Sequence, residues 1–289
     1  MPYESIYKPR LFQGQTIIVT GGGSGIGRCT AHELASLGAN VVIIGRSDER
    51  LGGVAAEIAE DGGIVRSQVC DIREEERVRE VVAATVDEFG GIDGLVNNAG
   101  GQYKAPLEEI STKGFEAVVR NNLTGGFIVM REVFTAHMKE HGGSIVNIIA
   151  DIWGGWPGFA HSGAARGGML TLSESAAGEW AEFGVRVNSL APGSIASSGL
   201  DTYPAHQRSY IRNSVILRQP LRRFGSESEV SAGIVFLLSP AAAFITGSCL
   251  RVDGAAPNGR RWTLAGSNNN AVYNGFHRAQ SPKILEGED

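Results

Sequence analysis

The chain has 289 residues, of which 42% are hydrophobic and 20% are charged, and its formal net charge is −5. This composition is ordinary for a globular protein, and no apolar run is long enough to cross a bilayer. The negative charge disfavours nucleic-acid binding, and three widely spaced cysteines disfavour a disulfide framework or a zinc site. Because the first residues contain no apolar signal segment, we expect a cytoplasmic protein without nucleic-acid, membrane or metal partners.

Short apolar runs alternate with longer amphipathic stretches through most of the chain. Runs rich in Val, Ile and Leu, typical of strands buried on both faces, occupy 15–20, 40–45, 64–69, 94–99, 143–150, 185–191 and 248–252. Helical patterns lie near 25–37, 48–60, 73–89, 113–139, 161–182 and 226–239. This alternation predicts an α/β fold: a single doubly wound parallel sheet with helices on both faces, in the Rossmann manner.

Two segments do not follow this alternation. Residues 196–224 contain no clear strand, and we expect a helical flap over the carboxyl ends of the strands, where ligands bind in such sheets. Residues 255–289 are polar and rich in Gly and Asn, which predicts an irregular tail. The sequence therefore favours one domain over residues 1–254, followed by the tail 255–289.

A glycine-rich segment, TGGGSGIG at residues 20–27, follows the first expected strand and leads into the first expected helix. Its glycines allow a tight turn and a close approach of the backbone to a pyrophosphate, and the helix N-terminus offers free amide groups. Strand, turn and helix occur in the order that a dinucleotide-binding motif requires. The residues expected to contact the cofactor here are Gly21, Ser24, Gly25, Ile26 and Gly27.

The end of the second expected strand, GRSDE at residues 45–49, bears on which dinucleotide binds. A carboxylate at this place would bind the ribose 2′-hydroxyl of NAD and would repel a 2′-phosphate. Arg46 occupies it instead, and a guanidinium suits a phosphate. We therefore expect NADP(H) as the cofactor, with a solvated loop residue as the alternative role of Arg46.

Four motifs, TGGGSGIG, NNAG (97–100), NLTGG (122–126) and VRVNSLAPGSI (185–195), resemble those of the short-chain dehydrogenase/reductase family in order and spacing. The resemblance covers about residues 15–254 and implies a Rossmann fold, a nicotinamide cofactor and a homotetramer. The cofactor contacts that it implies are Asp71 and Ile72 near the adenine, Asn98, Ala99 and Gly100 along the adenosine ribose, and Pro192, Gly193 and Ile195 at the nicotinamide. Asn122 matches the asparagine of the family's proton relay, with a buried structural hydrogen bonder as the alternative.

The catalytic positions depart from the family pattern. Where the family usually has serine, tyrosine and lysine, this chain has Ala150, Ser162 and Arg166. The segments GSIVNII, HSGAAR and LLSPAAAFITG resemble peroxisomal trans-2-enoyl-CoA reductases and, more distantly, 2,4-dienoyl-CoA reductases. The sequence also resembles bacterial citronellol/citronellal dehydrogenases of acyclic terpene utilisation, so the resemblance implies an acyl-CoA or a terpenoid substrate.

Ser162 and Arg166 lie one helical turn apart and can face the nicotinamide ribose together. A serine hydroxyl is too weak an acid to replace the tyrosine, and arginine stays protonated near neutral pH. Both side chains can still donate hydrogen bonds to negative charge on a thioester oxygen or to the ribose. We therefore expect an oxidoreductase that transfers hydride from NADPH to an α,β-unsaturated acyl-CoA.

Other readings stay open at this stage. Asp151 and His161 are titratable and could replace the tyrosine if the loop DIWGGWPGFA (151–160) folds over the site, which would permit alcohol or aldehyde chemistry of the citronellol type. Their structural alternatives are a loop turn for Asp151 and a helix N-terminal position for His161. A chain without the tyrosine could also bind NADP as a non-catalytic sensor.

Two groups of side chains indicate how a substrate would be held. Aromatic residues of the same loop favour an apolar pocket, with core packing as the alternative: Trp153, Trp156 and Phe159. A cluster of arginines within the expected flap would suit the phosphates of coenzyme A, with a solvated face as the alternative: Arg208, Arg212, Arg218, Arg222 and Arg223.

Overall fold

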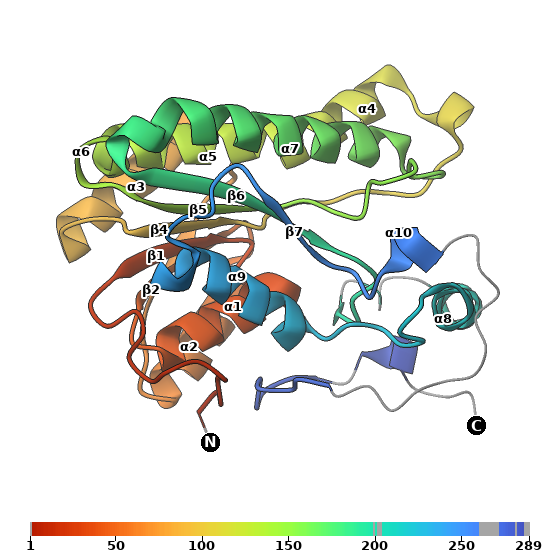
Figure 1. Cartoon of the computed structure of the whole chain (residues 1–289), viewed down its shortest axis with the longest axis horizontal. Helices are drawn as coiled ribbons and strands as arrows, with labels where there is room; N and C mark the ends of the chain where they lie inside the picture. Colours follow the sequence, from red (N-terminus) through yellow and green to blue (C-terminus); the bar gives the residue numbers. More distant parts are fainter. Residues whose placement is uncertain (1, 199, 201–203, 260–271, 281, 286–289) are drawn as a thin grey trace.

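Seven parallel strands form one sheet in the order β3-β2-β1-β4-β5-β6-β7 (Figure 1). The structure is a computed structural model that describes residues 2–198, 200, 204–259, 272–280 and 282–285, with backbone alone for 205–207, 210, 216–218 and 284. The strands are β1 (Thr16–Thr20), β2 (Asn40–Gly45), β3 (Ile64–Val69), β4 (Gly94–Asn97), β5 (Gly143–Ile148), β6 (Val185–Pro192) and β7 (Cys249–Val252). The predicted doubly wound α/β fold is confirmed.

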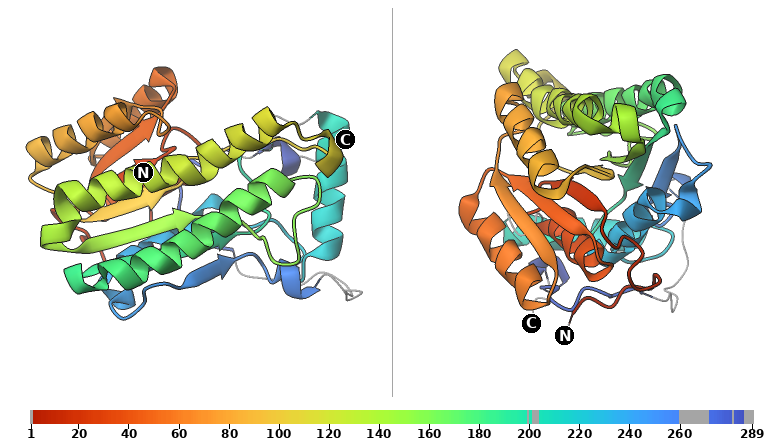
Figure 2. Two further views of the ribbon diagram at one scale, coloured as in Figure 1. Left: turned by 90° about the horizontal axis from the view of Figure 1, so that it is seen from above. Right: turned by 90° about the vertical axis from the view of Figure 1, so that its left-hand side faces the viewer.

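Helices cover both faces of the sheet in two layers (Figures 1 and 2). One layer consists of α1 (Gly25–Ser36), α2 (Asp48–Glu60) and α9 (Glu227–Leu238). The other consists of α3 (Glu75–Phe89), α4 (Thr112–Val119), α5 (Gly125–Val133), α6 (Lys139–His141) and α7 (Ala160–Trp180). The strands' side chains alternate between the two layers: Ile17 and Val19 pack with the first, and Ile18 packs with the second.

The helical stretch expected near 113–139 is interrupted by wider turns. Between α4 and α5 the chain forms a π-helical turn at Arg120–Thr124, and a second one follows α5 at Phe134–Met138. Such turns insert an extra residue into an α-helix and occur often at functional sites. The first of them carries Asn122, whose side chain is described below. Periodicity by itself does not reveal a one-residue insertion of this kind.

The strand order places a ligand-binding crevice at the carboxyl ends of the strands. Sheet order runs one way from β1 through β2 and β3, and the other way from β1 through β4 to β7. Ligands bind in open α/β sheets where the order reverses in this manner, because neighbouring loops separate there. The crevice of this chain is therefore expected between the loops that follow β1 and β4.

Further helices lie beyond β6. Helix α8 (Ala205–Arg218), within the expected flap, lies at the carboxyl-end edge of the sheet (Figure 2, left). Helix α10 (Ala256–Gly259) and the short 3-10 helix η7 (Lys283–Leu285) lie in the C-terminal region. Within the described ranges, no helix has both the length and the apolar character needed to span a membrane.

Candidate cofactor and active site

The glycine-rich turn closes tightly around the end of β1. Gly21 and Gly25 have φ angles of +68° and +57°, a region that glycine adopts without strain. Ser24 precedes α1 without forming a side-chain cap, so the first amide groups of the helix remain available to an anion. A Cβ at Gly27 would overlap with the carbonyl oxygen of Gly21. The turn therefore has the geometry of a phosphate cradle.

Asn98 supports this turn from behind. Its Nδ2 donates to the carbonyl oxygen of Thr20 at 3.0 Å, and the backbone N–H groups of Asn98 and Ala99 donate to the Thr20 hydroxyl at 3.0 and 2.9 Å. These bonds fix the NNAG segment against β1. The side chain of Asn98 thus stabilises the turn, and its expected packing along the ribose stays a prediction.

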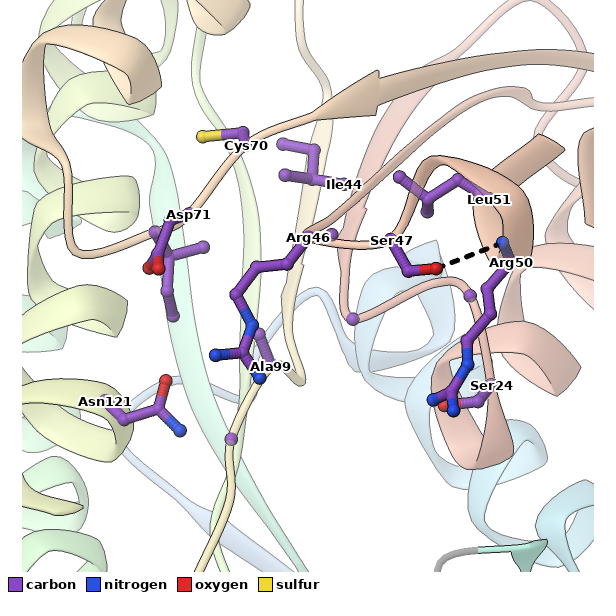
Figure 3. A pocket seen from close by; sticks show the side chains of 15 residues that line it. Ser24, Ile44, Arg46, Ser47, Arg50, Leu51, Cys70, Asp71, Ala99 and Asn121 are labelled. Carbon is purple, nitrogen blue, oxygen red and sulfur yellow. Dashed lines mark hydrogen bonds between the residues drawn. The ribbon is translucent and has the colours of Figure 1, made fainter. Parts of the chain in front are cut away.

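A pocket opens where β1, β2, β3 and β4 end (Figure 3). Among the described residues, its lining includes seven of the sequence-predicted cofactor residues: Gly21, Ser24, Arg46, Asp71, Ile72, Ala99 and Gly100. Other residues that no sequence motif indicated also line it, among them Ser47, Arg50, Cys70 and Asn121. The remaining predicted cofactor residues, Gly25, Ile26, Gly27, Asn98, Arg166, Pro192, Gly193 and Ile195, lie outside this pocket lining.

Two guanidinium groups extend into this pocket. Figure 3 shows Arg46 reaching in from the end of β2 and Arg50 reaching toward Ser24 from the first turn of α2. Ser47 caps α2 by accepting a hydrogen bond from the Arg50 N–H at 3.4 Å, which fixes where this helix begins. The position of Arg50 in the first turn after the Arg46 loop is the signal that could have revealed it.

The one acidic side chain of the described lining is already paired. Asp71 accepts a hydrogen bond from Arg73 Nε at 2.8 Å, and this guanidinium lowers the pKa of Asp71 to about 2, with a smaller contribution from Arg46. Asp71 is therefore ionised at neutral pH, and its charge is balanced by Arg73. Arg46 and Arg50 form no ion pair within the described residues, so the pocket retains positive charge.

Arg166 lies buried beneath the NNAG loop. Its Nη1 donates to the carbonyl oxygen of Ile148 at 2.5 Å, at the end of β5, and its Nη2 lies so close to Gly100 that a Cβ there would overlap with it. Burial lowers the pKa of the guanidinium to about 10, which leaves it protonated at neutral pH. No carboxylate of the described residues pairs with it. A buried cation without a counter-ion is electrostatically costly and favours an anionic ligand or transition state nearby.

Ser162 is fully buried and is already hydrogen-bonded. Its hydroxyl donates to Oε1 of Gln102 at 2.7 Å, and Gln102 is exposed on the loop after the NNAG motif. The bond leaves the two amide hydrogens of Gln102 available to a ligand. Gln102 was missed by the sequence analysis, and only its place two residues after Gly100 could have suggested it.

Asn122 uses its whole side chain to hold the same loop. Its Oδ1 accepts from the Gly101 N–H at 3.1 Å, and its Nδ2 donates to the carbonyl oxygens of Gly101 at 2.6 Å and Val118 at 3.0 Å. These contacts are those of a buried asparagine that stabilises the structure through its hydrogen bonds, which was the alternative role expected for Asn122. A direct role in proton transfer stays a prediction.

Asp151 begins the expected loop, and His161 directly follows it. The His161 ring is 0% exposed, packs edge-on against Tyr103 with 4.5 Å between ring centroids, and forms no hydrogen bond among the described residues. Asp151 follows β5, and its backbone N–H donates to the carbonyl oxygen of Pro192 at 3.2 Å. His161 is therefore next to Ser162 but enclosed in this conformation.

The expected nicotinamide segment continues β6. Gly193 N–H donates to the carbonyl oxygen of Val252 at 3.0 Å, and Ile195 forms an isolated bridge with Gly225. In the aromatic loop, the ring of Trp153 lies under the guanidinium of Arg251, with 5.2 Å between the ring centroid and Cζ. The ring centroids of Trp156 and Phe159 lie 5.2 Å apart. These segments follow the carboxyl ends of β5, β6 and β7.

Four of the five arginine side chains of the expected substrate handle lie within the described residues, and their contact with a substrate stays a prediction. Arg223 is bound by Glu229 at 2.6 Å, and Arg222 has a left-handed φ of +57°. Arg208 and Arg212 lie one turn apart on α8, and the side chain of Arg218 is outside the described residues. No group of three or more His, Cys, Asp or Glu side chains within the described ranges is arranged to hold a metal ion.

Comparisons with known proteins support a common origin. The sequence profile of a family described as enoyl-(acyl carrier protein) reductase matches residues 21–255. Peroxisomal 2,4-dienoyl-CoA reductase of Danio rerio is 35% identical over 259 residues, which are 88% of this chain and 85% of that protein.

Two solved structures share the fold. One, described as citronellol catabolism dehydrogenase (AtuB) of Pseudomonas aeruginosa PAO1, is 58% identical with a TM-score of 0.79 and covers 88% of this chain and 100% of that one. Another, from Beutenbergia cavernae, is described as an NAD(P)-dependent gluconate 5-dehydrogenase with NADP at low occupancy; it is 34% identical with a TM-score of 0.79, and covers 86% and 98% of the two chains. The chain belongs to the short-chain dehydrogenase/reductase family of oxidoreductases.

Proposed function

We propose that the chain is an NADPH-dependent reductase of α,β-unsaturated acyl thioesters. The observation that carries the proposal is the buried, protonated Arg166, which lies with Ser162 at the positions where the family resemblance implies a tyrosine and a lysine. Neither side chain can accept a proton from an alcohol near neutral pH. Both suit a reaction in which negative charge develops and is stabilised.

Reduction of a conjugated thioester matches these groups. When bound, NADPH supplies a hydride to the β-carbon; the electron pair of the double bond moves toward the thioester oxygen, and the α-carbon then takes a proton from water. Ser162 holds Oε1 of Gln102, so that an amide hydrogen of Gln102 can donate to this oxygen. Arg166 contributes a fixed positive charge from beneath Gly100.

The preference for NADPH is supported by charge. Arg46 and Arg50 can bind the 2′-phosphate from two sides, and Arg73 neutralises Asp71 so that it does not repel this phosphate. The solved relative with NADP at low occupancy is consistent with this preference. A homotetramer and a cytoplasmic location remain expectations from the family resemblance and the sequence.

The test compares substrates on the wild-type protein. NADPH consumption is measured with linear and methyl-branched enoyl-CoA thioesters, and NADP⁺ reduction is measured with citronellol. We expect turnover of at least one thioester and none of the alcohol. Ready oxidation of citronellol, with every thioester left unchanged, would contradict the proposal.

A second candidate is oxidation of a terpenoid alcohol or aldehyde, favoured by the 58% identity with the protein described as citronellol catabolism dehydrogenase. The base would then be His161 or Asp151, and opening of the 151–160 loop would have to expose the buried imidazole of His161. His161→Asn would abolish oxidation if His161 is the base, and Asp151→Asn would abolish it if Asp151 is the base. A non-catalytic sensor would bind NADPH and turn over neither substrate class.

The flap offers a handle for coenzyme A. Arg208 and Arg212 lie on neighbouring turns of α8 and can approach a phosphate group together. Changing both to Ala should raise KM for an enoyl-CoA more than for the same acyl group on a short thiol. Equal effects on both substrates would assign the two arginines to the structure of the flap.

A further inference from the structure

Residues 272–280, in the C-terminal tail, are irregular but docked. The family profile ends at residue 255, so this segment lies beyond the matched region. It runs beside the N-terminal segment, and the two are joined by a hydrogen bond from the Glu4 N–H to the Gly275 carbonyl oxygen at 3.1 Å (Figures 1 and 2). We call residues 272–280 the strap.

Phe276 anchors the strap on α1. Its ring is 4% exposed, stacks on Tyr3 with 5.7 Å between centroids, and lies 4.8 Å from the ring of His32. The guanidinium of Arg28 lies over the same ring, 4.8 Å from its centroid. An aromatic ring enclosed in this way contributes a large buried area and a cation–π contact.

The strap also holds the beginning of α9. Ser226, the N-cap of α9, donates its hydroxyl to the Tyr273 carbonyl oxygen at 2.9 Å, and the Phe276 N–H donates to the Ser228 hydroxyl at 3.3 Å. The Tyr273 hydroxyl donates to the buried carboxylate of Glu33, on α1, at 3.3 Å. Through these bonds the strap connects α1 and α9.

A third set of contacts reaches the end of α2. Arg278 donates to Glu60 at 2.8 Å and to Asp61 at 3.1 Å, and His277 Nε2 lies 2.7 Å from Asp61. Arg28 donates to the Arg278 carbonyl oxygen at 3.3 Å while it binds Glu57 of α2. Arg28 is therefore held by α2 and by the strap at once.

The helices that the strap connects also form the cofactor pocket. The N-terminus of α1 follows Ser24, and the first turn of α2 supplies Arg50. We propose that the strap fixes the spacing of α1 and α2, so that strap docking and dinucleotide binding stabilise each other. The proposal depends on dinucleotide binding at this pocket and not on the identity of the substrate. Local elements that open together can couple two sites in this manner.

The test uses the full chain with two matched substitutions in the strap. Phe276→Ala removes the buried anchor, and Val272→Ala shortens an apolar side chain that is 46% exposed in the same segment. The dissociation constant of NADPH is measured by calorimetry, together with amide hydrogen exchange of the strap in wild type. We expect Phe276→Ala to weaken NADPH binding by about tenfold, Val272→Ala to change it less than about twofold, and NADPH to slow exchange in the strap.

A folded Phe276→Ala protein with wild-type NADPH affinity would overturn the proposal. If this variant does not fold, Arg278→Ala keeps the ring and removes the ion pairs to α2, and it should weaken NADPH binding by about threefold; an unchanged affinity would again overturn it. If wild type binds NADH better, the same titrations are made with NADH. Failure of enoyl reduction would then contradict the proposed function without changing this result.

Discussion

At the ends of β1 and β2, the glycine-rich turn, Arg46 and Arg50 surround a pocket with side chains free to meet a ligand, whereas at the end of β5 the corresponding groups are enclosed. Ser162 is bonded to Gln102, and Arg166 is bonded to the Ile148 carbonyl oxygen. We call the region of the glycine-rich turn, Arg46 and Arg50 the adenosine half, and the region of Ser162 and Arg166 the reactive half. The adenosine half has the arrangement that binds a dinucleotide. In the reactive half, positioned hydrogen bonds and a buried charge stand where the family resemblance implies an acid–base pair.

Under the proposed function, this difference would separate cofactor binding from the type of reaction within one fold. The phosphate cradle depends on backbone amide groups and glycine conformations, which side-chain changes elsewhere leave intact. The reaction depends on the few groups next to the transferred hydride, where one substitution alters which charge can be stabilised.

The largest effect is expected for Arg166. Arg166→Met removes the buried positive charge and should lower kcat/KM for an enoyl thioester by about 100-fold or more, because the charge on the thioester oxygen loses its stabilisation. Arg166→Lys keeps the charge and should retain more activity than Arg166→Met. Steady-state kinetics check this, and equal losses in both variants would show that packing of the guanidinium, not its charge, matters.

A smaller effect is expected for Ser162. Ser162→Ala releases Gln102 and should lower kcat by about 10-fold with KM little changed, since the bond orients a group used in the transition state. Ser175→Ala, on the exposed face of the same helix, serves as the control and should leave kcat unchanged. A wild-type kcat in Ser162→Ala would remove this bond from the proposed reaction.

In the adenosine half, Arg46→Ala should weaken NADPH binding by about 10-fold and leave NADH binding within about twofold, because only NADPH carries the 2′-phosphate. Arg50→Ala should act in the same direction. The dissociation constants of NADPH and NADH are measured by calorimetry for each variant. As a control, kcat at saturating cofactor should be unchanged. Equal losses for the two cofactors would mean that the guanidinium supports the pocket and not the phosphate.

The smallest effect concerns Glu227, whose carboxyl lies near Gly25 at the start of α1. Burial raises the pKa of Glu227 to about 7. Between the ordinary pKa of a glutamate, about 4.5, and pH 7, the folded state therefore keeps a proton on this carboxyl that the unfolded state has lost. The free energy of unfolding should therefore fall as pH rises from about 4.5 to 7, with a slope of at most about 1.4 kcal/mol per pH unit from this group.

Glu227→Gln removes this titrating group, so the free energy of unfolding should depend less on pH between about 4.5 and 7. The measurement is urea unfolding at several pH values, with Glu116→Gln, an exposed glutamate of α4, as the control. An identical slope in Glu227→Gln and wild type would contradict the raised pKa.

Much of the fold followed from the sequence. The Val- and Ile-rich runs predicted all seven strands to within about two residues at each end, because parallel strands buried on both faces need continuous apolar segments. The exceptions are informative: the stretch near 113–139 contains two π-helical turns, and the tail contains a docked strap. A one-residue helical insertion and the docking of an irregular polar segment leave no periodic signal in the chain.

By itself, the sequence determined the glycine-rich turn, the place of Arg46, and the presence of Ser162 and Arg166 at positions four residues apart, since each depends on residues only a few positions apart. Tertiary structure alone decided that Ser162 meets Gln102, 60 residues earlier, and that Phe276 packs on α1. Local conformation is set by neighbouring residues. Contacts between distant segments are set by which surfaces the fold buries together, and one protein's sequence pattern carries no record of that pairing.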